Sequence, residues 1–472
     1  MADAVVYQIF PDRFRRSGRV AAQRGLQLLP WGSDPAGNGF QGGDLYGVLD
    51  QLGALQDLGV SCVYLTPIFC SAANHRYHTY DYFQVDPLLG GNEALEALIT
   101  ALHDRGMRLI LDGVFNHCGR GFWAFHHLLE NGAESPYRDW FTVEQWPLVP
   151  YPRRRNERCG YAAWWDLPGL PKFNHANPAV QNYLLQVGRH WLERGIDGWR
   201  LDVPDEVPLP FWQDFRRMVR AVNPDAWIVG EIWGDPAAWL EGACFDGVMN
   251  YRLAWSCLGF AAGRRLRPGL ARPSRPYAAL DGAACAERLQ QVLLELAPAF
   301  RCSQMNLLDS HDVPRALHVL RDDLAALRLA LLLLFSLPGA PCLYYGTELG
   351  LSGGEEPACR EALPQEAEAI PHDLRPWIAS LAAVRHSLPA LRSADLQAEA
   401  LRDSRGRAEG LLLQRGTSTR VVLHRGRRGH LPLPVTADRW TVAWPPERCG
   451  QEAPASLGPQ EGLVLIRQEE PR

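Results

Sequence analysis

The chain has 472 residues, 47% of them hydrophobic, and a formal net charge of −5. This length and composition predict a packed globular protein with one large domain and attachments. No basic patch or polyanion-binding run is present, so we expect no nucleic-acid partner. The N-terminus lacks a basic signal region, and the most apolar stretch, 324–337, is too short to span a bilayer and contains Arg328. We therefore expect a buried helix at 324–337 and no membrane partner.

Strand-like and helix-like segments alternate along the first 390 residues. Repeated strand–helix units indicate a parallel sheet, and eight of them can close into a (β/α)8 TIM barrel. We expect helices at 45–58, 94–105, 179–194, 211–222, 286–296, 324–337 and 373–386. The eight strands are predicted at 5–10, 62–66, 108–114, 198–203, 226–232, 247–251, 305–308 and 342–345.

One connection in this pattern is far longer than the others. Residues 118–178, between the third strand and the next helix, are rich in Trp, Pro, Tyr and Arg, and a loop of this length is typical of a functional insertion or small subdomain. Its aromatic residues could line a cleft or form the insertion's own core: Trp123, Trp140, Trp146, Tyr161, Trp164 and Trp165.

The character of the sequence changes after residue 390. Short β-like segments at 410–414, 420–424 and 462–466 are separated by Gly and Pro, which predicts an antiparallel β-sandwich. The predicted domains are therefore a catalytic barrel (1–117 and 179–390), an inserted domain (118–178) and a C-terminal β domain (391–472).

The cysteines and lysines have an unusual distribution. Eleven cysteines occur without a CxxC pair, which in a chain of enzyme size indicates reduced thiols and a cytoplasmic location. Lys172 is the only lysine among the 48 basic residues, and we attribute this to a coding bias.

The stretch 198–203, Gly-Trp-Arg-Leu-Asp-Val, carries the clearest chemical signal. Alternate residues of a strand share a face, so Arg200 and Asp202 point the same way. A buried arginine beside a carboxylate is tolerated when the two pair. Glu231 ends the next predicted strand. Two carboxylates on successive strand ends suit glycoside cleavage, with one as nucleophile and the other as acid and base.

Two more predicted strands end in polar residues. The third strand ends Asp112-Gly-Val-Phe-Asn-His117, and the seventh is followed by Asp309-Ser-His-Asp312. Active sites of parallel barrels lie at the carboxyl ends of the strands. Any one of these acids could be a structural cap or ion pair, but together on one rim they predict an active site.

These motifs carry a family resemblance. Segments 112–117 (DGVFNH), 198–203 (GWRLDV), 231–233 (EIW) and 310–312 (SHD) resemble, in order and spacing, the conserved regions of the α-amylase superfamily, glycoside hydrolase family 13. Segment 170–174 (LPKFN) resembles a fifth region in its neopullulanase, cyclomaltodextrinase and maltogenic amylase branch. The resemblance covers about residues 3–390, together with a C-terminal β domain of the expected kind.

The resemblance implies roles for individual residues. Asp202 would be the nucleophile, Glu231 the acid and base, and Asp312 the residue that holds sugar hydroxyls and favours a distorted ring. Arg200 would lower the pKa of Asp202, while Glu231 would keep a raised pKa and lie roughly 5–5.5 Å from it. Further substrate contacts are implied for hydrogen-bonding His117, His311 and His78, for Tyr80 as a stacking ring, and for Lys172, Glu206 and Trp233.

The resemblance implies a retaining hydrolase of α-1,4, and in some relatives α-1,6, bonds in maltooligosaccharides, cyclodextrins, pullulan or starch, with some transglycosylation. A 4-α-glucanotransferase or an exo-acting α-glucosidase would use the same residues. A non-catalytic carbohydrate-binding relative is disfavoured by the intact carboxylates.

The resemblance also bears on ions and partners. Asn116 corresponds to a calcium ligand of many amylases, but this branch often lacks the ion, so we expect no required cofactor and no metal. Relatives carry an extra N-terminal β domain that exchanges across a dimer, whereas here the barrel begins at residue 3. We therefore expect a monomer or a non-swapped homodimer, with a more open cleft.

Overall fold

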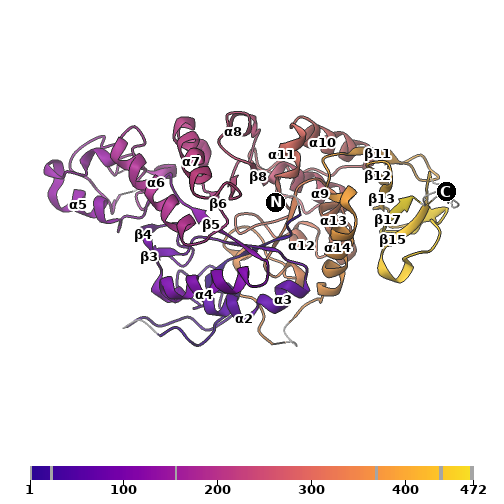
Figure 1. The fold of residues 1–472 in the computed structure, drawn as a ribbon, viewed down its shortest axis with the longest axis horizontal. Helices are drawn as coiled ribbons and strands as arrows, with labels where there is room; N and C mark the ends of the chain where they lie inside the picture. Colours follow the sequence, from indigo (N-terminus) through magenta and orange to yellow (C-terminus); the bar gives the residue numbers. More distant parts are fainter. Residues whose placement is uncertain (1–2, 22–24, 155–156, 367–369, 435–439, 468–472) are drawn as a thin grey trace.

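The computed structural model describes residues 3–21, 25–154, 157–366, 370–434 and 440–467. A closed barrel of eight parallel strands occupies the middle of the molecule, with the inserted segment at one end and a C-terminal sheet at the other (Figure 1). The predicted TIM barrel is confirmed. Its strands in spatial order are β1 (Val6–Ile9), β2 (Cys62–Leu65), β5 (Arg108–Gly113), β6 (Gly198–Leu201), β7 (Trp227–Gly230), β8 (Gly247–Asn250), β9 (Met305–Leu307) and β10 (Ala340–Tyr344).

The barrel strands are buried on both faces, because helices cover the outside and side chains fill the interior. Every residue of β1, β2, β6 and β7 is buried. The first strand closes the barrel, since Val6 lies opposite both Cys62 and Cys342. This closure brings the carboxyl ends of all eight strands to one rim.

The predicted helices are present with shifted ends. The segment predicted as one helix at 45–58 is two, α2 (Leu45–Asp50) and α3 (Leu52–Asp57), separated at Gln51. The apolar helix α13 (Leu324–Ser336) is buried except for residues near its start and Arg328, whose guanidinium lies 5.1 Å from the Trp377 ring centre. The other helices are α4 (Gly91–His103), α6 (Pro178–Glu193), α7 (Leu209–Val222), α10 (Gly282–Leu294), α13 (Leu324–Ser336) and α14 (Arg375–Ser387).

The sequence does not predict several elements that the structure contains. The long helix α9 (Tyr251–Ala262) follows β8 directly. Asn250 is both the last residue of the strand and the N-cap of the helix, so no loop separates the two elements in the sequence. A hairpin of β3 (Phe69–Ser71) and β4 (Thr79–Val85) follows β2. The short helices are α1 (Pro11–Phe14), α8 (Ala237–Leu240), α11 (Pro298–Cys302) and α12 (Ala316–Val319).

The segment between β5 and α6 folds around its own aromatic residues. It contains α5 (Trp123–Asn131) and isolated bridges, among them His117 with Lys172 and Ala163 with Pro171. Phe125 lies 4.8 Å from the buried Tyr161, ring centre to ring centre. The bridges tie the two ends of the segment to the rim of the barrel.

The predicted C-terminal antiparallel β domain is confirmed. In β12 the side chains alternate, with Leu411 and Leu413 packing into the main core and Leu412 into a second, smaller core. One face of the sheet therefore packs on the barrel. The sheet order is β11 (Gln397–Leu401), β12 (Gly410–Arg415), β13 (Thr419–His424), β17 (Glu461–Arg467) and β15 (Trp440–Trp444), beside a ribbon of β14 (Leu431–Pro432) and β16 (Ser456–Leu457).

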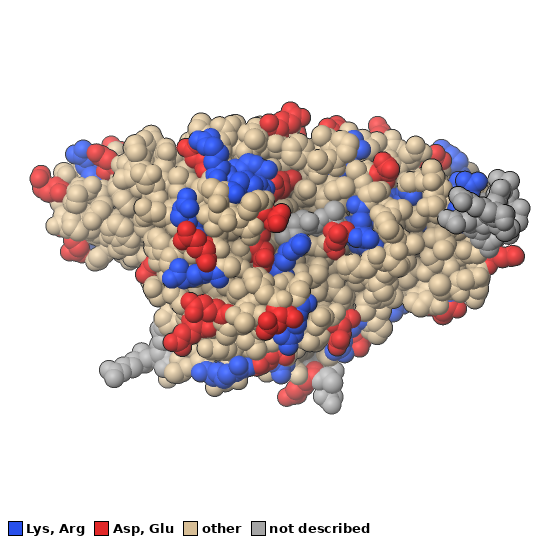
Figure 2. Space-filling view, viewed as in Figure 1, with Lys and Arg blue, Asp and Glu red and all other residues tan. Residues whose placement is uncertain are grey.

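The surface carries mixed charge. Acidic and basic side chains are interspersed over the face shown in Figure 2. Arginines of α7 are paired, since Arg216 and Arg220 lie 2.7 and 2.5 Å from Asp246. Among the described residues, no helix combines the length and apolar character needed to cross a membrane.

Candidate active site

A cleft of about 700 Å³ opens at the carboxyl ends of the barrel strands. Its floor consists of side chains that follow β6, β7 and β9, and one wall belongs to the inserted segment. The predicted catalytic residues all line it, and so do several predicted contacts: Asp202, Glu231 and Asp312, with His78, His117, Glu206 and Trp233.

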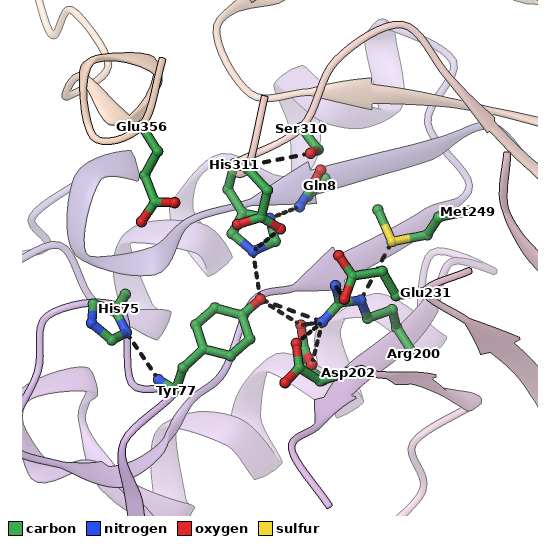
Figure 3. A network of polar contacts seen from close by, with 12 residues as sticks. Gln8, His75, Tyr77, Arg200, Asp202, Glu231, Met249, Ser310, His311 and Glu356 are labelled. Carbon is green, nitrogen blue, oxygen red and sulfur yellow. Dashed lines mark hydrogen bonds and ion pairs between the residues drawn. The ribbon is translucent and has the colours of Figure 1, made fainter. Parts of the chain in front are cut away.

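Arg200 is the centre of the floor (Figure 3). It is 0% exposed, and its Nη1 lies 3.0 Å from Oδ1 of Asp202, which confirms the predicted pairing. Its Nη2 lies 2.8 Å from Oε2 of Glu231. Nη1 also donates to both oxygens of Asp112 at 2.9 Å. One guanidinium therefore holds both candidate catalytic carboxyls and a third carboxylate beneath them.

Asp112 is held from a second side. The Tyr64 hydroxyl donates to its Oδ2 at 2.6 Å, and the Tyr77 hydroxyl donates to the same oxygen at 3.0 Å. Both tyrosines and Arg200 therefore satisfy the oxygens of Asp112 away from solvent. It therefore anchors the guanidinium from below.

The electrostatics of the floor differ from the expectation for Asp202. Burial is the largest effect and raises the pKa of the Asp202 carboxyl well above its ordinary value. Arg200 lowers this pKa, but Glu231, Asp112 and Asp312 raise it again. Arg200 therefore acts in the predicted direction, but the net pKa of Asp202 is raised, because burial and the neighbouring acids together outweigh one guanidinium. Burial also raises the pKa of Glu231, as expected.

Glu231 is fixed by its neighbours. The Trp233 indole N–H donates to its Oε1 at 3.2 Å, and the Trp233 ring stacks on Tyr251 with centres 4.1 Å apart.

Val203, the residue after the candidate nucleophile, has φ +43°, an uncommon value for a β-branched residue. Such strain persists where surrounding contacts over-determine the backbone, and it concentrates at functional sites.

Asp312 lies on the opposite side of the floor. Nε2 of His311 lies 3.0 Å from its Oδ2, and Nη2 of Arg360 lies 3.1 Å from its Oδ1. Although burial alone would raise it, the pKa of Asp312 falls below its ordinary range because of His311, Arg360 and Arg200. Asp312 is thus an ionised group of the cleft floor.

His311 itself does not line the cleft. Its ring is 0% exposed, with Nδ1 2.7 Å from Nε2 of Gln8 and Nε2 2.5 Å from the Tyr77 hydroxyl. Tyr77 stacks on it with ring centres 5.4 Å apart. In this structure the contacts of His311 orient Asp312, and its expected hydrogen bond to a sugar stays a prediction.

The hairpin after β2 places only one of the two expected residues, His78, at the site. Tyr80 does not line the cleft. It is the second residue of β4, on the same face as Tyr82, and its ring lies against Gly121, where an added β-carbon would be 3.2 Å away. The predicted stacking role of Tyr80 is therefore wrong. Tyr77 and His75, which precede the strand, line the cleft beside His78.

His117 is suited to contact a ligand. It is 1% exposed, its Nε2 has no partner among the described residues, and burial lowers its pKa to about 3, so the ring is neutral. Lys172 lies beside the cleft, with its Nζ 2.8 Å from Oε2 of Glu206, and both side chains are partly exposed. Lys172 and Glu206 therefore form an ion pair on the rim.

Asn116, the expected position of a calcium ligand in many amylases, has one free amide oxygen. Its Oδ1 is buried without a partner, and its Nδ2 lies 3.2 Å from Nδ1 of His117. Within the described ranges, no group of three or more His, Cys, Asp or Glu side chains is arranged to hold a metal ion. The expectation that no calcium ion is required stays a prediction.

Several site residues escaped the sequence reasoning. His75 and Tyr77 precede the expected His78, and only the fold shows that they line the cleft. Gln8 lies within β1, while Glu356 and Arg360 follow β10. A search for polar residues within β1 and in the segment after β10, in addition to the strands that carry motifs, would have pointed toward these three.

The chain is similar to known proteins whose names agree with a site of this kind. Residues 8–375 match the family described as "Alpha amylase, catalytic domain". The chain belongs to the α-amylase family. A curated member, the cyclomaltodextrinase of Geobacillus thermopakistaniensis, is 41% identical over 396 residues, which are 84% of this chain and 64% of that protein. The chain therefore spans less than two thirds of the length of this α-amylase family member.

Two similar solved structures cover nearly the whole chain. Ttha1563 from Thermus thermophilus superposes with a TM-score of 0.89 at 44% identity, over 99% of each chain. The cyclic α-maltosyl-(1→6)-maltose hydrolase of Arthrobacter globiformis superposes with a TM-score of 0.86 at 37% identity, also over 99% of each chain. The barrel, the insertion and the C-terminal sheet are therefore shared with these structures.

Proposed function

We propose that this protein is a retaining α-glucan hydrolase that acts through a covalent glycosyl-enzyme. The carrying observation is the single Arg200 guanidinium, which lies 3.0 Å from Asp202 and 2.8 Å from Glu231. Because both carboxyls contact one guanidinium, this arrangement is evidence that Asp202 and Glu231 act on the same anomeric carbon, one as nucleophile and the other as acid and base. The separation of roughly 5–5.5 Å between the two carboxyls that a direct nucleophile needs stays a prediction.

In the first step, an Asp202 carboxylate oxygen attacks the anomeric carbon. The bond from that carbon to the glycosidic oxygen breaks, and Glu231 transfers its proton to the departing oxygen. Arg200 stabilises the carboxylate before attack. Asp312 and the neutral His117 bind hydroxyls of the same ring, and the ionised Asp312 favours the positive charge that develops on it.

In the second step, Glu231 accepts a proton from water as the water oxygen attacks the anomeric carbon. The ester bond to Asp202 breaks, and the carboxylate returns to Arg200. Two inversions leave the product with the configuration of the substrate. The two carboxyls together hold one proton in the resting state, because their burial disfavours a double negative charge.

The proposed substrates are short linear and cyclic α-glucans with α-1,4 and α-1,6 bonds. The names of a cyclomaltodextrinase and a cyclic α-maltosyl-(1→6)-maltose hydrolase among the similar proteins support this class. A 4-α-glucanotransferase remains the second candidate, since a sugar hydroxyl could replace water in the second step.

The proposal is tested by product analysis on maltotriose, β-cyclodextrin, pullulan, starch and cyclic maltosyl-maltose in parallel. Proton NMR of fresh product should show the α-anomer first, and reducing ends should rise with each bond cleaved. Initial β-anomer would contradict the double displacement. Rearranged chains without new reducing ends would instead favour the transferase.

We also propose a cytoplasmic location and a monomeric or non-swapped dimeric state. The location is supported by the eleven cysteines, all of which are free of disulfides. The oligomeric state stays a prediction, and analytical ultracentrifugation at two concentrations would measure it.

A further inference from the structure

Trp165 is an exposed aromatic residue on the wall of the cleft. Its side chain lines the same cavity as Asp202 and Glu231, and the residue is 75% exposed. Exposing an indole to water is unfavourable, and exposed aromatic surface inside a cleft commonly marks a contact for a ligand. The predicted roles of the floor residues leave this ring unexplained.

The indole of Trp165 is fixed on its inner face. It stacks on Trp164 with ring centres 4.6 Å apart and planes 16° apart. Trp164 in turn stacks on His117, with centres 5.1 Å and planes 11° apart. Three nearly parallel rings therefore run outward from the residue proposed to contact the reacting sugar, and the outer face of the last ring is open.

The backbone that carries this ring is strained. Trp165 and Asp166 have φ values of +50° and +56°, in the left-handed region that is unfavourable for residues other than glycine. Hydrogen bonds on both sides hold the turn, including Trp164 N–H to Leu170 O at 2.9 Å and Leu167 N–H to Trp164 O at 2.9 Å. The fold thus maintains an unfavourable backbone that presents the indole to the cleft.

We propose that Trp165 is a stacking platform for a second glucosyl ring of the substrate, next to the ring held over Asp202. The apolar face of a pyranose matches the exposed indole, whereas the hydroxyls at its edge remain free for polar groups of the cleft. The platform makes the enzyme select gluco-oligosaccharides of two or more units over single glucosides. This inference rests on the proposed function.

The test compares two substrates in the intact chain. Maltotetraose can cover Trp165, whereas α-glucosyl fluoride carries a single ring with fluoride as its leaving group. The measured quantity is kcat/KM for maltotetraose divided by kcat/KM for α-glucosyl fluoride. In Trp165→Ala this ratio should fall about tenfold, equivalent to roughly 1.4 kcal/mol, and Trp165→Phe should restore most of it.

Tyr151→Ala is the matched control. Tyr151 belongs to the same inserted segment and is 68% exposed, but it does not line the cleft. Its removal should leave the ratio at the wild-type value. An unchanged ratio in Trp165→Ala, with an active wild type, would overturn the platform alone. A wild type inactive on both substrates would overturn the proposed function and the platform with it.

Discussion

The floor and the insertion wall of the cleft are built on opposite principles. The floor is a buried ionic network on strand ends, where Arg200 is 0% exposed and Asp202 is 5% exposed. The wall presents Trp165, 75% exposed, on a strained turn. Charges interact strongly when buried, whereas an open aromatic face selects rings by contact. We therefore assign chemistry to the floor and substrate selection to the wall.

The largest effect is expected from removing the nucleophile. Asp202→Asn should lower kcat by roughly four orders of magnitude or more, because the ester can no longer form. Steady-state rates on maltotriose measure this loss, and circular dichroism with a thermal midpoint serves as the control for folding. A folded variant that retains a tenth of the activity would refute the role of Asp202.

Replacing the shared cation should change the pH dependence as well as the rate. Asp202 must be ionised to attack, so its raised pKa places the acidic limb of kcat/KM above the ordinary aspartate range. Arg200→Met removes the charge that lowers this pKa, and the acidic limb should therefore move to higher pH. Profiles of residual activity measure the shift.

The same variant should lose stability in a pH-dependent way. Carboxyls with raised folded-state pKa values stabilise the fold at low pH and lose this contribution as pH rises through the folded value. Arg200→Met should therefore lower the free energy of unfolding by roughly 3–5 kcal/mol at pH 7. The loss at pH 4 should be smaller. The control is Arg76→Met, which breaks a buried pair with Asp86 elsewhere. In Arg76→Met the acidic limb of the kcat/KM profile should stay at the wild-type pH. An acidic limb that moves equally in Arg200→Met and Arg76→Met would contradict the role of Arg200.

A smaller effect is expected from the support beneath His311. Gln8→Met removes the amide that lies 2.7 Å from Nδ1 of the ring. The ring then loses its orientation toward Asp312, and kcat should fall roughly ten- to a hundredfold with little change in KM. Gln304→Met, another fully buried glutamine, controls for lost packing. If KM rises while kcat holds, Gln8 does not act through the floor.

The smallest effect is expected at the rim. Lys172→Met breaks the partly exposed pair with Glu206, which is worth about 0–1 kcal/mol to stability. The thermal midpoint should hardly change, while KM for maltotetraose should rise by a factor of about two to five. Lys172→Arg keeps the charge and should restore most of the affinity. A loss confined to kcat would place Lys172 with the floor instead.

The sequence predicts those features that depend on residues close together in the chain, and it misses those that depend on contacts between distant segments. The barrel strands and the pairing of Arg200 with Asp202 depend on alternation within one strand, so they are predictable. Tyr77, in contrast, reaches the floor because the β3–β4 hairpin turns Tyr80 toward the insertion, and no local pattern reports that turn. Gln8 contacts a residue 303 positions away along the chain.

The pKa of Asp202 shows the same limit for electrostatics. The sequence places Arg200 beside Asp202, but it does not reveal that Asp112 and Glu231 share the guanidinium. The parallel pairing of β5 with β6 and of β6 with β7 brings the ends of these three strands together. The sign of the shift depends on the number of acids around one cation and on their burial, which are properties of the fold.

The most direct test of the floor's role is to trap the covalent intermediate. The enzyme is incubated with 5-fluoro-α-glucosyl fluoride, whose first step releases fluoride and whose second step is slow, and the digested protein is analysed by mass spectrometry. We expect a fluoroglucosyl ester on the peptide that contains Asp202, at that side chain. An adduct on Glu231 or Asp312, or turnover without any adduct, would contradict the assignment of Asp202 as nucleophile.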